Sequence, residues 1–205
     1  NDAKAICELA KRYDCLTIVD AVTSLGGIEL DVDGWNIDAI YSGTQKCLSC
    51  VPGLSPVSFS PAAVEVIKNR KTPVQSWFLD MDLVMGYWGK GGKRAYHHTA
   101  PVNSLYALHE SLRILHNEGL EQAWKRHADM HQALKTGLES IGLEFVVDEA
   151  YRLPQLNMVS IPNLDKWVCL HHYKFQIPFY TTVKRLLYNR FSCYSYLSSV
   201  RINEK

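Results

Sequence analysis

The segment CLTIVDAVTSLGG, residues 15–27, predicts a strand that runs into a turn at an acidic residue. Leu16 to Val19 form a short apolar run without alternation, which is typical of a parallel strand buried on both faces. Asp20 ends this run, and small residues with two glycines follow it. A second segment of this kind, NIDAIYSGTQKCL at 36–48, has an apolar run that ends in a turn and then Lys46. The two segments predict neighbouring strands whose ends carry functional groups.

The sequence around this pair alternates between helical and strand patterns. Apolar residues at helical spacing predict a helix over 1–13. A third strand is expected in 53–60, where Pro56 favours an edge or an early position in the strand. Ser60 and Pro61 form an N-cap with proline at the first helical position, which predicts a helix to about residue 69. The later expectations are a long functional loop at 70–103, helices at 104–117 and 120–141, and strands in LEFVVD (143–148) and LNMVSIP (156–162). This order predicts an α/β protein with a mainly parallel sheet and flanking helices, followed by the start of a smaller α+β domain.

The composition is that of a globular protein, with 47% hydrophobic and 21% charged residues. No stretch approaches the roughly 18–20 apolar residues of a membrane span, so no membrane partner is expected. A net charge of +1 argues against a nucleic-acid partner. Residues 166–205 differ from the rest: they carry seven basic residues and one acidic residue and show no sustained period. We expect this tail to be divergent and poorly ordered.

The cysteine and histidine patterns do not favour a metal site. The CxxC at 47–50 has no second pair nearby and no surrounding βαβ pattern, so two small apolar residues in a turn are the simpler interpretation. His97 and His98 are adjacent and should point in opposite directions on an extended segment. His127 and His131 have a metal-capable spacing but no third ligand, and they lie on an apolar stripe. We therefore predict that the chain binds no metal.

Asp20 and Lys46 are the candidate catalytic pair. Ligands of open parallel sheets bind beyond the carboxyl ends of the strands, where both residues are expected. Such a pair is often an ordinary salt bridge. A lysine that forms a Schiff base, however, needs a lowered pKa, which partial desolvation supplies. A flat ring against Val22 with its nitrogen at Asp20 would stay protonated and act as an electron sink.

The turn SGTQK, residues 42–46, adds two hydroxyls, one carboxamide and backbone N–H groups directly before the lysine amine. This set could bind a phosphate at close range. The two segments therefore predict a site for a phosphorylated aromatic cofactor.

Three motifs in this order, VDAVTSLGG (19–27), YSGTQK (41–46) and YHHTAP (96–101), resemble those of fold-type I pyridoxal-phosphate aminotransferases. More narrowly, the sequence resembles the alanine–glyoxylate and serine–pyruvate aminotransferase family, which includes insect hydroxykynurenine transaminases. The resemblance runs from residue 1 to about Asp165. It implies that 1–118 is part of the cofactor-binding large domain, that 119–165 starts the small C-terminal domain, and that 166–205 is a divergent tail.

The resemblance also implies roles for single residues. Lys46 would bind the cofactor covalently and then act as general base, while Asp20 would pair with the pyridine nitrogen. Val22 would pack against the face of the ring, and Gln45 would contact the phosphate. Tyr96 and Thr99 would reach the phosphate of the cofactor in a neighbouring subunit. A homodimer with shared active sites is therefore implied. The full set of implied cofactor-binding residues is Asp20, Val22, Gln45, Lys46, Tyr96 and Thr99.

The implied reaction moves an amino group from alanine or serine to glyoxylate or another 2-oxo acid. The family's phosphate loop would precede this sequence, and its substrate-binding arginine is not matched, because Arg201 and Ile202 are followed by asparagine. A truncated, non-catalytic form of such an enzyme is therefore an alternative. A cysteine desulfurase is less well supported, because Cys169 and Cys193 lie in the unmatched tail. The resemblance leaves a peroxisomal, mitochondrial or cytoplasmic location open.

Overall fold

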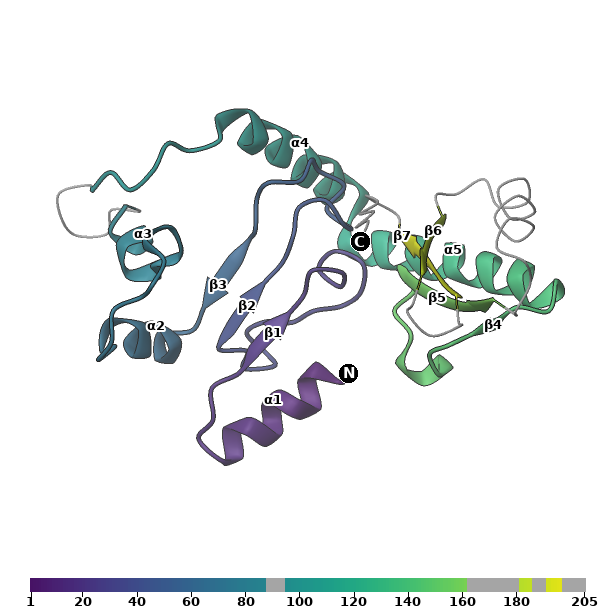
Figure 1. Cartoon of the computed structure of the whole chain (residues 1–205), viewed down its shortest axis with the longest axis horizontal. Coiled ribbons are helices and arrows are strands. Elements are labelled where there is room, and N and C mark those ends of the chain that lie inside the picture. The colour runs from purple at the N-terminus through teal and green to yellow at the C-terminus, as the bar shows by residue number, and fades with distance from the viewer. Residues whose placement is uncertain (88–94, 162–180, 186–190, 197–205) are drawn as a thin grey trace.

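The computed structural model describes residues 1–87, 95–161, 181–185 and 191–196, which form two sheets with flanking helices (Figure 1). The amino-terminal elements are α1 (Ala3–Arg12), β1 (Ile18–Asp20), β2 (Ala39–Tyr41), β3 (Val57–Phe59), α2 (Pro61–Lys68), the 3₁₀ helix η1 (Trp77–Leu79) and α3 (Met81–Tyr87). The later elements are α4 (Val102–Glu118), α5 (Leu120–Ser140), β4 (Glu144–Phe145), the 3₁₀ helix η2 (Glu149–Tyr151), β5 (Leu156–Ile161), β6 (Thr181–Arg185) and β7 (Phe191–Tyr196). Within these described residues, no helix is long and apolar enough to cross a membrane.

The first sheet has the order β1-β2-β3. β1 and β2 are parallel, as predicted, and their register pairs Asp20 with Tyr41. β3 is antiparallel to β2, since no helical crossover separates the two strands. Pro56 directly precedes β3, which lies at one edge of this sheet, so the position predicted from the proline is confirmed.

The core beside this sheet lies on one of its faces. Cys7 of α1 packs there with Ile40 of β2, and Val19 of β1 adds to the same cluster. The prediction that β1 is buried on both faces is wrong for the described residues, since Ile18 is 77% exposed. The reason is strand geometry: neighbouring side chains of a strand point to opposite faces, and Val19 takes the covered one.

A buried carboxylate links the elements at the end of the first sheet where β1 and β2 begin. Asp38, 5% exposed, accepts hydrogen bonds from the Thr17 backbone N–H at 3.0 Å and the Ser60 hydroxyl at 2.9 Å. Ser60 is also the N-cap of α2, where its Oγ accepts from Ala63 N at 3.1 Å, as the Ser-Pro pair predicted. One side chain therefore holds the starts of β1, β2 and α2 together.

The segment predicted as a long loop, 70–103, contains regular structure. It includes η1 and α3, while residues 88–94 lie outside the described part of the chain. The helices after it agree with prediction to within two residues. Gly119 separates α4 from α5. Its φ of 88° lies in the left-handed region, which glycine adopts more readily than residues with a side chain.

The second sheet has the order β4-β5-β7-β6 and is antiparallel throughout. α5 packs on it through Leu138, which joins Leu143 and Val159 in a second apolar cluster. This helix-on-sheet arrangement is the predicted start of an α+β unit. The strand predicted at 143–148 is shortened to two residues and followed by η2. β6 and β7 fall within 166–205, where no strand was predicted; the rest of that tail lies outside the described residues.

Candidate functional site

The loops that follow β1 and β2 are joined at one edge of the first sheet. The Ala21 N–H donates to the Tyr41 carbonyl at 2.9 Å, and the Ser42 hydroxyl donates to the Ala21 carbonyl at 2.8 Å. Further along both loops, the Cys47 thiol donates to the Thr23 carbonyl at 3.5 Å. The two loops that carry Asp20 and Lys46 are therefore in direct contact, at the carboxyl ends of two parallel strands.

Asp20 is held in place by two hydrogen bonds while remaining exposed. Its Oδ1 accepts from the Val22 N–H at 2.9 Å, and its Oδ2 accepts from the Tyr41 hydroxyl at 2.9 Å. A carboxylate offers about four lone-pair positions, so a further donor can still be accepted. The arrangement supplies an oriented acceptor beside the Val22 backbone.

Tyr41 is a site residue that the sequence reasoning missed. Its strand position is opposite Asp20, so both side chains leave the sheet on the same side. The hydrogen bond to Asp20 raises the pKa of the Tyr41 phenol above its ordinary value, with burial and the Asp20 charge acting in the same direction. The available signal was the pairing of the two strands: aligning IVD with AIY places the phenol beside the carboxylate.

Removing the Asp20 charge should lower the pKa of Tyr41 toward the value of an exposed tyrosine. In ¹³C-tyrosine NMR titrations, the Tyr41→Phe variant assigns the Tyr41 signal, and Asp20→Asn tests the shift. The expected result is a lower midpoint for that signal alone. An unchanged midpoint in Asp20→Asn would show that the two side chains do not interact in solution.

Lys46 is half-buried in the loop after β2. Desolvation lowers the pKa of its amine, while the neighbouring Cys47 thiol opposes this change. Burial also raises the pKa of Cys47 to about 11, against the positive charges of Arg126 and Lys46. The pair is therefore an amine shifted toward its neutral, nucleophilic form beside a thiol that stays protonated at neutral pH.

The two hydroxyls of the turn do not serve the predicted phosphate role. The Ser42 Oγ donates to Ala21, as described above, and the Thr44 Oγ1 donates to the Val51 carbonyl at 2.7 Å. Both residues are buried, and a phosphate needs donors that point outward. The Gln45 carboxamide remains a candidate: it folds over Gly43, where an added Cβ would lie 2.9 Å from Gln45 Oε1.

Tyr96 and Thr99 lie apart from these loops. Their hydroxyls are hydrogen-bonded to one another, and Tyr96 is 72% exposed. Figure 1 shows their segment beside α3, beyond the amino end of α4 and away from the loops that follow β1 and β2. The structure of this single chain therefore brings Asp20, Val22, Gln45 and Lys46 to one edge and leaves Tyr96 and Thr99 at another place.

The adjacent histidines between those two residues face each other, contrary to prediction. His97 Nδ1 and His98 Nδ1 are 2.7 Å apart, because this segment is not a regular extended strand. His97 Nε2 lies 3.0 Å from the Trp77 carbonyl, to which only an N–H can donate. With both rings neutral, His97 Nδ1 is then the acceptor and His98 Nδ1 carries the proton.

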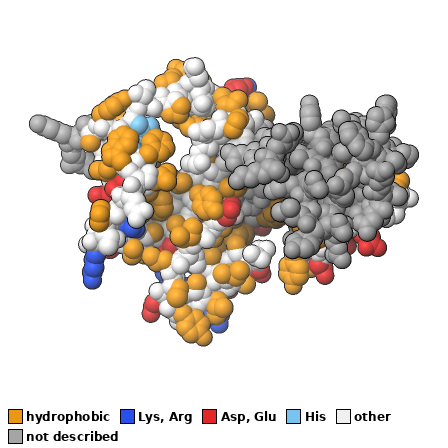
Figure 2. All heavy atoms as spheres, viewed as in Figure 1, with side chains coloured by type: hydrophobic (Ala, Val, Ile, Leu, Met, Phe, Trp, Pro, Cys, Tyr) orange, Lys and Arg blue, Asp and Glu red, His pale blue; other side chains and the backbone are white. Residues whose placement is uncertain are grey.

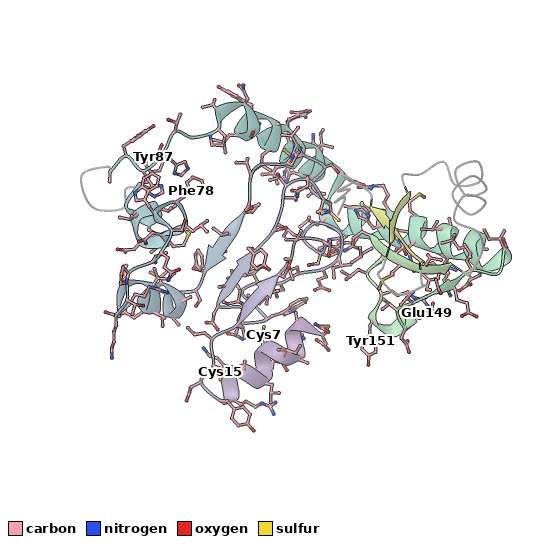
Figure 3. The ribbon with its side chains drawn as sticks, in the orientation of Figure 1. Cys7, Cys15, Phe78, Tyr87, Glu149 and Tyr151 are labelled. Carbon is pink, nitrogen blue, oxygen red and sulfur yellow. The ribbon has the colours of Figure 1, made fainter. Side chains whose placement is uncertain are left out.

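Aromatic side chains enclose this histidine pair. Trp77 stacks on His97 with ring centroids 4.0 Å apart, and Tyr87 stacks on His98 at 5.8 Å. Figure 3 shows Phe78 and Tyr87 close together in this cluster, and Figure 2 shows histidine surface among hydrophobic side chains over the same part of the molecule. The cluster anchors the segment that carries Tyr96 and Thr99 to η1 and α3.

The remaining metal candidates have other roles. His127 is buried on α5, and burial lowers the pKa of its imidazole. His131 Nδ1 lies 2.6 Å from Asn157 Oδ1. In the described ranges, no group of three or more His, Cys, Asp or Glu side chains could hold a metal ion.

Gln155 is the second residue that sequence reasoning missed. It lies 132 positions from Thr23, yet its Nε2 donates to the Thr23 carbonyl at 2.7 Å. No local sequence pattern connects the start of β5 with the loop after β1. The contact forms only because the segment before β5 lies beside the loop after β1 in the folded chain.

Comparison with known proteins places this arrangement in a family. Residues 1–168 match the aminotransferase class-V family. The chain is 44% identical over 177 residues to the alanine–glyoxylate aminotransferase of Oryctolagus cuniculus, covering 83% of this chain and 45% of that protein. It is 42% identical over 162 residues to the alanine–glyoxylate aminotransferase of Drosophila melanogaster, covering 78% and 41%.

Solved structures that resemble this chain are also aminotransferases. A Nostoc alanine–glyoxylate aminotransferase superposes with a TM-score of 0.82 at 39% identity, covering 93% of this chain and 50% of that one. The ureidoglycine–glyoxylate aminotransferase of Bacillus subtilis gives a TM-score of 0.84 at 33% identity, covering 95% and 50%. The chain thus spans about half the length of these relatives, and its α/β fold is that of the fold-type I aminotransferases. The family match over most of the chain and these relatives lead to one conclusion: the chain belongs to the class-V aminotransferase family.

Proposed function

We propose that the protein is a pyridoxal-phosphate-dependent transaminase that moves an amino group from alanine or serine to glyoxylate or another 2-oxo acid. The observation that carries this proposal is the contact between the loops after β1 and β2, which sets an oriented carboxylate and a desolvated amine at one sheet edge. The names of the relatives, aminotransferases that use glyoxylate, support the substrate class.

The residues at this edge fit pyridoxal phosphate in their donor and acceptor chemistry. Asp20 can accept a hydrogen bond from a protonated ring nitrogen in addition to the two that it already accepts. Lys46, with its lowered pKa, suits covalent attachment through Nζ. Val22 follows at the position for a ring contact, and the Gln45 carboxamide is the candidate contact to the phosphate. When bound, the cofactor supplies an electron sink for the substrate α-carbon.

The chain's own groups then have defined tasks. Asp20 keeps the ring nitrogen protonated, because an ionised carboxylate beside it stabilises the positive charge. Lys46 Nζ takes the proton from the substrate α-carbon as general base, and partial burial keeps its amine closer to the neutral form that this step needs.

We further propose a homodimer with shared sites. The segment that carries Tyr96 and Thr99 lies away from the loop after β2 within one chain (Figure 1), and both residues are exposed, so they are available to reach the phosphate bound by a second subunit. We also propose that 1–118 is part of the cofactor-binding domain and that 119–165 starts the small domain.

The test of the function is to add pyridoxal phosphate to the chain, follow the absorbance change of covalent attachment, and reduce the product with borohydride. Peptide mass mapping should place the modification on Lys46, while exposed Lys68 of α2 serves as the control site. A separate sample that has not been reduced with borohydride is supplied with alanine and glyoxylate, and pyruvate is measured. Attachment without pyruvate would favour a non-catalytic form, and no attachment at Lys46 would refute the proposal.

The attachment rate should depend on pH in a way that follows from burial. Only the neutral amine attacks the aldehyde, so the rate rises with pH as Lys46 loses its proton. Because desolvation lowers the pKa of this amine, half of the maximal rate should be reached below the value of about 10.4 for an exposed lysine. Stopped-flow absorbance from pH 6 to 11 measures the midpoint. Free N-acetyl-lysine amide is the control, and equal midpoints would contradict the expectation.

A further inference from the structure

The carbonyl oxygen of Thr23 joins three segments that are distant in sequence. Gln155 Nε2 of the segment that begins β5 donates to it at 2.7 Å, and Cys47 Sγ donates to it at 3.5 Å. Thr23 directly follows Val22, and Cys47 directly follows Lys46. Both loops of the candidate site therefore meet at one oxygen, next to the residues proposed to contact the ring and to bind the cofactor.

Gln155 is committed to this contact. It is 5% exposed, and its Oε1 has no hydrogen-bond partner in the described part of the structure. The orientation of the amide is set by its partner, since a carbonyl oxygen can accept only from the NH₂ end. Burying the Oε1 of an amide without a hydrogen-bond partner costs free energy. The bond from Nε2 to the Thr23 carbonyl is therefore the interaction that holds the Gln155 side chain in this position.

The packing around this junction leaves no spare room. A Cβ added to Gly27 would lie 2.8 Å from Cys47 Sγ and 2.8 Å from Gln155 Cδ, which is closer than Cβ contacts in real proteins. The missing side chain at Gly27 therefore allows the thiol and the carboxamide to approach the same carbonyl. The Gln155 carboxamide and the thiol of Cys47, the residue after Lys46, therefore both border the space beside Gly27.

We propose that Gln155 is a positioning residue, which holds the Thr23 carbonyl against Cys47 and so sets the separation of Val22 and Lys46 at the cofactor site. The role given to this separation, which is to hold the cofactor, rests on the proposed function. This positioning couples the second sheet, through the start of β5, to the reactive lysine, although Gln155 itself lies outside the set of groups proposed to touch the cofactor. Displacement of β5 loosens both loops together.

The test compares two nearly isosteric substitutions at buried positions of the same segment. Gln155→Met removes the donor to Thr23 and keeps the side-chain length. Asn157→Leu is the matched control: Asn157 is 4% exposed, and its side chain bonds to His131 and to the Pro154 carbonyl instead of to the site loops. Thermal unfolding of both variants measures the stability that each substitution costs, and the two losses are expected to be similar.

Two readouts separate positioning from stability. The first needs no cofactor: iodoacetamide alkylation of Cys47, followed by peptide mass mapping, should accelerate about tenfold in Gln155→Met, because one of the bonds that close the junction is lost. The second is covalent attachment of pyridoxal phosphate to Lys46, which should slow at least about fivefold. Asn157→Leu should leave both rates within about twofold of the wild type.

Gly27→Ala provides a second route to the same junction if Gln155→Met does not fold. Its Cβ displaces the Cys47 thiol and the Gln155 amide from the other side, so it should change both rates in the same directions. Unchanged Cys47 alkylation in the folded variants, or equal changes in Asn157→Leu, would overturn the proposal. Failure of wild-type Lys46 to attach the cofactor would instead defeat the proposed function, and the alkylation result is read independently of it.

Discussion

Lys46→Ala is expected to abolish covalent attachment of pyridoxal phosphate and to reduce transamination by at least about a thousandfold. The variant removes both the nucleophile and the general base. The loop after β2, residues 42–56, contains no other lysine that could replace it. Asp20 and its two hydrogen bonds should be unaffected, because they depend on Val22 and Tyr41. The measurement is the absorbance of the attached cofactor together with pyruvate formation from alanine and glyoxylate.

Two controls make this result specific. Lys46→Arg keeps a positive charge but cannot lose it near neutral pH, so it should also fail to attach the cofactor. Lys68→Ala, on the exposed face of α2, should leave both signals unchanged. If Lys46→Ala still attached the cofactor at the wild-type rate, another lysine would be the reactive one, and the proposed site would be wrong.

Asp38→Ala is expected to lower the free energy of unfolding by about 3 kcal/mol, the largest stability effect predicted for the described residues. The substitution leaves the Thr17 N–H and the Ser60 hydroxyl without their acceptor in a buried environment. It also removes the connection between the starts of β1, β2 and α2. Urea unfolding followed by circular dichroism measures the change.

Asp33→Ala is the matched control, because Asp33 is an exposed aspartate in the loop between the same two strands. Its effect should stay within about 0.5 kcal/mol. Asp38→Asn should fall between the two, since its amide oxygen can satisfy one donor and its NH₂ group meets the other unfavourably. A loss below about 1 kcal/mol for Asp38→Ala would show that water or a rearranged loop replaces the buried carboxylate.

Some features of this protein follow from short stretches of sequence alone. The apolar runs that end at Asp20 and Tyr41 were sufficient to predict β1 and β2, because a strand that packs on a core needs apolar residues in a short run. The Ser60–Pro61 pair located the start of α2 for the same kind of reason: capping involves only a few neighbouring residues. The motifs around Lys46 and Tyr96 were specific enough to indicate the family.

Other features were decided only by tertiary structure. The hydroxyls of Ser42 and Thr44 looked available to a phosphate in the sequence, but they bond to carbonyls of other segments once the loops pack. The exposure of Ile18, the regular structure at 77–87 and the strands β6 and β7 likewise depend on which elements lie against which.

The contacts of Asp20 with Tyr41 and of Gln155 with Thr23 show the limit most clearly, since they join residues 21 and 132 positions apart. Hydrogen bonds within a turn or a cap are encoded by neighbouring residues, so the sequence reveals them. A hydrogen bond between distant segments forms only when whole elements pack in one register, and that register is a property of the folded chain.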